Sequence, residues 1–83
     1  MPYYTYILYS ESLNRYYIGS SENPEKRLER HNARATVSTR GGRPWKVVYK
    51  EQYDSRKEAI SRENFIKRMK SRKFIQSLIN SKG

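Results

Sequence analysis

The first twenty residues carry the pattern of two β-strands joined by a short turn. Residues Tyr3–Tyr9 form a β-branched and aromatic run without a helix breaker, which predicts a strand. The polar stretch Glu11–Asn14 predicts a hairpin turn, and Arg15–Ser20 predicts the returning strand. Gly19 ends this strand, either as a β-bulge or as a point where another group comes close to the backbone.

A short helix is predicted next. Asn23 is a favourable N-cap, Pro24 suits the first helical position, and Glu25 complements the positive end of the helix dipole. The helix should end near His31. Its apolar content is thin, essentially Leu28, so most of this helix is expected to face solvent or a ligand.

A stretch without periodicity separates this helix from a third strand. Residues 32–44 carry three arginines, a glycine pair and a proline, which predicts a basic surface loop. Residues Trp45–Tyr53 then alternate well enough to predict a strand.

Two more helices complete the chain. Ser55 and Glu58 have the spacing of a capping box, so a helix should begin after Ser55 and end near Lys70. At helical spacing it carries Ala59, Ile60, Glu63, Ile66, Lys67 and Met69. Residues 71–80 predict a last helix, with core-facing residues Phe74, Ile75, Leu78 and Ile79. The order β-β-α-β-α-α predicts one α+β domain over residues 1–83, with a three-stranded antiparallel sheet flanked by helices.

Composition limits the class of protein. With 83 residues and 35% hydrophobic content, the core must be small. The chain has no cysteine, which excludes disulfides and thiolate zinc sites and is typical of an intracellular protein. There is no signal-peptide pattern and no apolar run of the ~20 residues that a membrane span needs. We therefore expect a cytoplasmic protein that is not bound to a membrane.

The net charge of the chain indicates what kind of molecule it binds. Lys and Arg number 18 against 8 Asp and Glu, a net charge of +10 that attracts polyanions, nucleic acid first among them. A ribosome-associated protein, or a basic surface that only maintains solubility, are the alternatives. Backbone contacts of this kind give affinity without sequence information and weaken with salt. The residues expected to make them are Arg34, Arg40, Arg43, Lys67 and Arg68.

Five residues have the chemistry to hydrolyse a phosphodiester. Tyr6 and Tyr17 lie in adjacent predicted strands, and Arg27 and His31 are four apart on one helix face. Glu63 lies in the middle of the next helix. A carboxylate can hold a hard divalent cation, an arginine can neutralise charge on the phosphate, and a phenol or imidazole can handle the proton of an attacking water.

These residues resemble the GIY-YIG nuclease family over almost the whole chain. Residues 4–6 (Tyr-Thr-Tyr) match the first element of the motif, although its Gly and Ile are replaced, and residues 17–19 (Tyr-Ile-Gly) match the second. The resemblance implies a metal-dependent endonuclease that acts on DNA in preference to RNA and takes part in DNA repair. A protein partner that supplies target specificity is possible, and the chain should be a monomer or a weak dimer.

The same resemblance assigns roles. Tyr6 and Tyr17 would line the site, Arg27 would hold the scissile phosphate, and His31 would support it or relay protons. Glu63 would be the only protein ligand of one Mg²⁺ or Mn²⁺. Tyr17 is the candidate general base, which requires a nearby positive charge such as that of Arg27.

Several alternatives stay open at the level of sequence. Tyr4 can replace Tyr6 if the motif slips by two residues, and Asn64 or Asn80 can be the late asparagine of the family. Glu63 can form an ordinary i,i+4 ion pair with Lys67. The competing function is a nucleic-acid-binding module without catalysis, which would have no use for the Glu63 carboxylate. A protein–protein adaptor is the third possibility.

Overall fold

The computed structural model describes residues 2–33 and 43–81 and confirms the predicted element order. The elements are β1 (Tyr3–Ser10), β2 (Arg15–Ser21), α1 (Pro24–Asn32), β3 (Trp45–Tyr53), α2 (Arg56–Met69) and α3 (Arg72–Ser81). Some predicted boundaries shift by a residue: β1 continues to Ser10, β2 runs past Gly19 to Ser21, and α3 spans Arg72–Ser81. The fold is therefore the predicted α+β domain.

The three strands form one antiparallel sheet in the order β2-β1-β3. Strand β1 is central, so β2 lies at one edge and β3 at the other. Tyr6 pairs with Gly19 and Ile7 with Ile18. The β1–β2 turn contains Asn14 with φ of 53°, a left-handed conformation that asparagine tolerates better than most residues.

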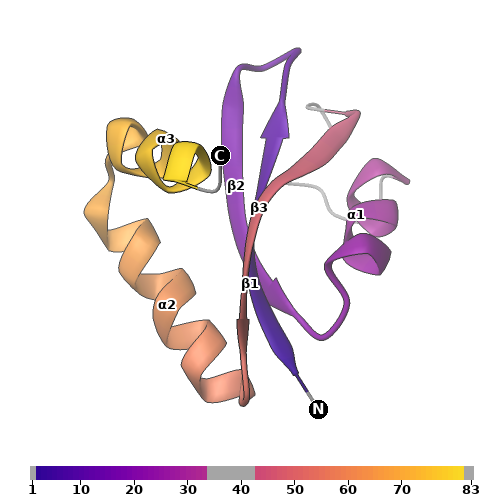
Figure 1. Ribbon diagram of the computed structural model, residues 1–83. Coiled ribbons are helices and arrows are strands. Elements are labelled where there is room, and N and C mark those ends of the chain that lie inside the picture. The colour runs from indigo at the N-terminus through magenta and orange to yellow at the C-terminus, as the bar shows by residue number, and fades with distance from the viewer. Residues whose placement is uncertain (1, 34–42, 82–83) are drawn as a thin grey trace.

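The helices cover both faces of the sheet. In Figure 1, α1 lies on one face, and α2 and α3 lie on the other. Because side chains alternate along a strand, each face has its own core. The face under α2 and α3 buries Ile7, Ile18, Ile66 and Ile75. The face under α1 buries Tyr6, Leu8 and Trp45.

The predicted core positions of the last helix are confirmed. Ile75 is buried, and Phe74, Leu78 and Ile79 pack against the same cluster. In α2, Met69 is 44% exposed, because the helix ends at this residue and the chain turns at Lys70, whose φ is 47°. Within the described residues, no helix combines the length and apolar character that a membrane span requires.

The predicted helix caps are also confirmed. The Asn23 side chain accepts a hydrogen bond from the Lys26 amide at 3.1 Å. Ser55 Oγ accepts from the Glu58 amide at 3.3 Å and donates to the Glu58 carboxylate at 3.0 Å. These caps fix where α1 and α2 begin, and thereby the faces that their later turns present to the sheet.

Candidate active site

Tyr6 lies against the backbone of Gly19. The two residues are opposite each other in the β1–β2 pair, and a Cβ atom added at Gly19 would lie 2.5 Å from Tyr6 Oη and 2.7 Å from Tyr6 Cζ. The strand register continues through Gly19 without a shift, so no β-bulge is present. Of the two predicted reasons for Gly19, close approach of another group is the correct one. Tyr4 lies opposite Ser21 instead.

The surroundings of Tyr6 keep its phenol protonated. Burial raises the pKa of Tyr6 to about 12, against the lowering effect of the Arg27 charge and of a hydrogen bond with Arg27. The charges of Tyr17 and Glu63 raise the pKa further. Tyr6 is therefore a hydrogen-bonding group near neutral pH, and its side chain lies within electrostatic range of Arg27, Tyr17 and Glu63.

Tyr17 and His31 form an aromatic pair on the α1 face. Their ring centroids are 4.8 Å apart in an edge-on arrangement, and the Trp45 ring lies 6.4 Å from that of Tyr17. His31 is 1% exposed, so it is a core residue on a helix that was expected to face solvent or a ligand. Burial, followed by the charges of Arg27 and Arg30, lowers the pKa of His31. Its imidazole is therefore neutral near pH 7.

Asn32 fixes the end of α1 to the start of β3. Its side chain donates to the Trp45 carbonyl at 3.1 Å and accepts from the Trp45 amide at 2.6 Å. The sequence pattern missed this role, because Asn32 stands where the helical periodicity ends and was assigned to the loop. The double hydrogen bond holds the last turn of α1, with His31 in it, against the sheet.

Glu63 approaches β2 from the opposite face of the sheet. Ser20 Oγ donates to Glu63 Oε1 at 2.7 Å, and Lys67 Nζ lies 2.6 Å from Glu63 Oε2. The ion pair with Lys67 that the sequence allowed is thus present. Ser20 was not predicted. The available signal was its position two residues after Ile18, which places a hydroxyl on a core-facing side of the strand.

Two hydrogen-bonded contacts set the position of α2 on the sheet. Thr5 Oγ1 donates to the carbonyl of Ala59 at 2.7 Å in a buried contact. Arg62 donates to Glu51 through Nε at 3.0 Å and through Nη2 at 3.2 Å. Because Arg62 directly precedes Glu63, its contact with β3 turns the Glu63 side of the helix toward β2.

The Glu51 carboxylate is the centre of a small polar network. It also accepts hydrogen bonds from Tyr53 at 2.6 Å and from Tyr49. Burial alone would raise the pKa of Glu51, but the hydrogen bonds from Tyr49, Tyr53 and Arg62, together with the Arg62 charge, lower it. Glu51 is therefore ionised near neutral pH, and its bonds to Arg62 are charge-assisted.

The two groups of side chains meet at the β2 edge. Tyr6, Tyr17, Arg27 and His31 belong to the α1 side, whereas Glu63 belongs to the α2 side. The strand between them has no neighbour beyond it in the sheet, and Gly19 adds no side chain there. The structure thus brings all five predicted residues to one strand, but from both of its faces.

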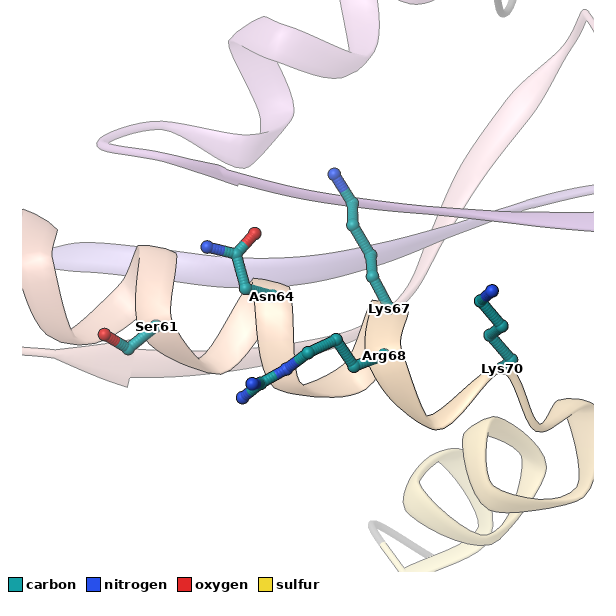
Figure 2. A pocket seen from close by; sticks show the side chains of 5 residues that line it. All are labelled: Ser61, Asn64, Lys67, Arg68 and Lys70. Atoms are coloured by element: carbon teal, nitrogen blue, oxygen red, sulfur yellow. The ribbon is translucent and has the colours of Figure 1, made fainter.

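Two surface hollows are lined in part by basic side chains. One has a volume of about 250 Å³ and is lined by residues that include Ser21, Lys26, Arg27 and Arg30. The other, on the outer surface of α2, has a volume of about 520 Å³. Figure 2 shows the five side chains that line it: Ser61, Asn64, Lys67, Arg68 and Lys70.

The predicted nucleic-acid contacts are placed as follows. Lys67 and Arg68 line the hollow on α2. Arg43 donates to the carbonyl of Asn32 at 3.4 Å, so at least part of its guanidinium is used within the protein. Arg34 and Arg40 lie outside the described residues. Of the two candidate asparagines, Asn64 lines the hollow on α2, whereas Asn80 lies on α3.

The Glu63 carboxylate is suited to binding a hard cation that needs few protein ligands. No group of three or more His, Cys, Asp or Glu that could hold a metal occurs within residues 2–33 and 43–81. A single carboxylate fits Mg²⁺, which keeps several waters and completes its shell with substrate phosphates. Glu63, whose side chain is 16% exposed, therefore suits such an ion better than Zn²⁺.

Together, the fold and the site define a small α+β domain. Its edge strand β2 carries the Tyr-Ile-Gly sequence, with α1 and Arg27 on one face of the sheet and α2 and Glu63 on the other. The family model of the GIY-YIG catalytic domain matches residues 2–76. The chain belongs to the GIY-YIG family.

Similar proteins are found among bacteria and fungi. The UPF0213 protein CPE1444 of Clostridium perfringens is 43% identical over 96% of this chain and 85% of its own length. The structure-specific endonuclease subunit SLX1 of Phaeosphaeria nodorum is 40% identical, over 55% of this chain and 14% of its own length. The solution structure of the UPF0213 protein BH0048 from Bacillus halodurans covers 100% of this chain and 87% of its own, with a TM-score of 0.62 and 28% identity.

Proposed function

We propose that this protein is a metal-dependent endonuclease that hydrolyses phosphodiester bonds of nucleic acid, DNA in preference to RNA. Membership of the GIY-YIG family and the likeness to an endonuclease subunit support nuclease activity. One observation carries the proposal: Glu63 is held by Ser20 at the β2 edge, where Tyr6 and Arg27 lie on the other side of the strand.

Glu63 is the residue proposed to hold the metal ion. A bound Mg²⁺ or Mn²⁺ would supply positive charge for the phosphate oxygens. Ser20 keeps the carboxylate in one orientation by donating to Oε1. Arg27 is proposed to bind the scissile phosphate, because its guanidinium reaches the exposed surface beside Tyr6 and lines the hollow next to β2.

The aromatic residues are proposed to position and move protons. Tyr6 remains protonated and can hold Arg27 in place or donate a hydrogen bond to a phosphate oxygen. Tyr17 is the proposed acceptor of the proton from the attacking water. Tyr17 can accept that proton only after its phenol has lost its own, and His31, which is neutral and lies against the Tyr17 ring, is the proposed acceptor of the phenol proton.

The test is cleavage of a substrate panel by the wild-type protein and by Glu63→Gln. The panel contains supercoiled plasmid, branched DNA, single-stranded DNA and RNA, each with Mg²⁺ or Mn²⁺. Glu29→Gln is the matched control, because Glu29 is an exposed carboxylate on α1 outside the site. We expect metal-dependent cutting that Glu63→Gln abolishes and Glu29→Gln retains, while both variants still bind the substrate.

Two results would contradict the proposal. If Glu63→Gln cuts as well as the control, the metal is not held by Glu63. If all three proteins bind every substrate in a salt-dependent way and cut none, the chain is a nucleic-acid-binding module that has the fold without the reaction.

A further inference from the structure

Both oxygens of the Glu63 carboxylate have partners within the protein. Ser20 donates to Oε1 at 2.7 Å, and the Lys67 ammonium donates to Oε2 at 2.6 Å. The two partners differ in kind. Ser20 orients the carboxylate without changing its charge, whereas Lys67 neutralises it.

A divalent cation and the Lys67 ammonium compete for the same carboxylate. Each is attracted to the negative charge of Glu63, and each repels the other. Glu63 Oε2 cannot bind a metal ion on the side that the ammonium occupies. A metal ion at Glu63 therefore requires Lys67 to move away, whereas the hydrogen bond from Ser20 can remain.

Lys67 has somewhere to move. Its side chain is 49% exposed, and a flexible four-carbon chain carries the ammonium. It lines the open hollow of about 520 Å³ on α2, and no carboxylate lines this hollow with it. Figure 2 shows Lys67 and Arg68 leaving the same turn of α2 in different directions. An ammonium released here is in basic surroundings and needs an anion, such as a phosphate.

We propose that Lys67 is an exchangeable counter-ion: it neutralises Glu63 in the free protein and transfers to a backbone phosphate when nucleic acid and metal ion bind. This inference rests on the proposed function, because it takes Glu63 as the metal ligand. It gives Lys67 two different partners in the two states. It also explains why an ammonium lies at the carboxylate, since without one Glu63 would be a partly buried negative charge in the metal-free protein.

The first arm of the test measures metal binding to the free protein. Mn²⁺ is titrated into ¹⁵N-labelled wild type, Lys67→Met and Lys57→Met, and paramagnetic broadening of the Ser20 and Glu63 amide signals is followed. Lys57 is a matched control, because it is an exposed lysine of α2 for which the same charge is lost. We expect Lys67→Met to bind Mn²⁺ roughly tenfold more tightly than Lys57→Met, about 1.4 kcal/mol.

The second arm measures nucleic-acid binding with the opposite expected sign. The probe is a fluorescein-labelled DNA duplex with phosphorothioate linkages, which slow cleavage. Without Mn²⁺, Lys67→Met and Lys57→Met should bind the duplex equally, because Lys67 is then occupied by Glu63. With saturating Mn²⁺, Lys67→Met should bind about tenfold more weakly than the control, the loss of one phosphate contact.

The possible failures are distinct. Mn²⁺ can broaden the Ser20 and Glu63 signals equally in both lysine variants, while Glu63→Gln abolishes the broadening. That result would support the metal site at Glu63 and refute the exchange of Lys67. The same holds if Lys67→Met weakens DNA binding equally with and without Mn²⁺. If Mn²⁺ never affects these signals, with or without the duplex, the proposed metal site and the exchange both fall.

Discussion

Replacing Gly19 with alanine tests whether the Tyr6 ring occupies the space above this residue. A β-carbon at this position would lie 2.5 Å from Tyr6 Oη and 2.7 Å from Cζ, closer than real contacts allow. Tyr6 is 1% exposed and cannot simply swing into solvent. Forcing an extra methyl group into such packing costs about 1–3 kcal/mol. We expect Gly19→Ala to lower the free energy of unfolding by that amount.

The same substitution made in a Tyr6→Leu protein should change stability in the opposite direction. In Tyr6→Leu the atoms nearest to the added methyl group are gone, and Gly19→Ala should then stabilise the protein by about 0.4–1 kcal/mol by restricting the unfolded chain. Urea unfolding can be followed through Trp45, the only tryptophan of the chain, which is buried beside Tyr17. If Gly19→Ala stabilises the wild type, or has the same effect in both backgrounds, the Tyr6 ring does not lie on Gly19.

Three further substitutions test the contacts around the site. Glu51→Gln should destabilise the protein at pH 7 by about 1–3 kcal/mol. Because the pKa of Glu51 is lowered in the fold, this contribution should disappear in urea unfolding as the pH falls below the usual glutamate range. The pKa of His31 is also lowered, so the unfolded chain binds a proton more readily, and stability should fall between about pH 7 and pH 5. His31→Gln should remove that slope. Thr5→Val should cost about 1 kcal/mol and speed hydrogen exchange of the Glu63 amide.

The order of the elements could be predicted from sequence because local signals agree with the fold. Asn23 and Ser55 cap their helices with their own side chains, and the Trp45–Tyr53 strand has the predicted limits. The misses have physical causes. Helical periodicity cannot show which turns of a helix lie over the sheet, so the sequence placed Met69 in α2 without showing that its side chain is 44% exposed. The thin apolar content of α1 also concealed that His31 is buried, because an imidazole can pack as a core residue.

The sequence names candidate site residues but not their arrangement in space. A motif names Tyr6, Tyr17 and Glu63, but it does not show that Glu63 and the tyrosines lie on different faces of the sheet. Ser20 illustrates the limit, because its role follows from the cross-strand register and from the position of α2, and both are long-range properties. Lys67 was correctly anticipated as an ion-pair partner, since i,i+4 spacing is a local relation.

Helix α1 on one face and helix α2 on the other each form side-chain hydrogen bonds to β3, the edge strand opposite β2. Asn32 binds α1 to the first residue of β3, and Arg62 binds α2 to Glu51 further along the same strand. Each anchor lies next to a site residue in sequence, His31 in one helix and Glu63 in the other. Since the sheet is only three strands wide, fixing a helix at one edge determines what it presents at the other. Among the residues that the structure describes, the outer edge of β2 thus stays unpaired beside the candidate site residues, while Asn32 and Arg62 hold the two helices at the strand on the far edge of the sheet.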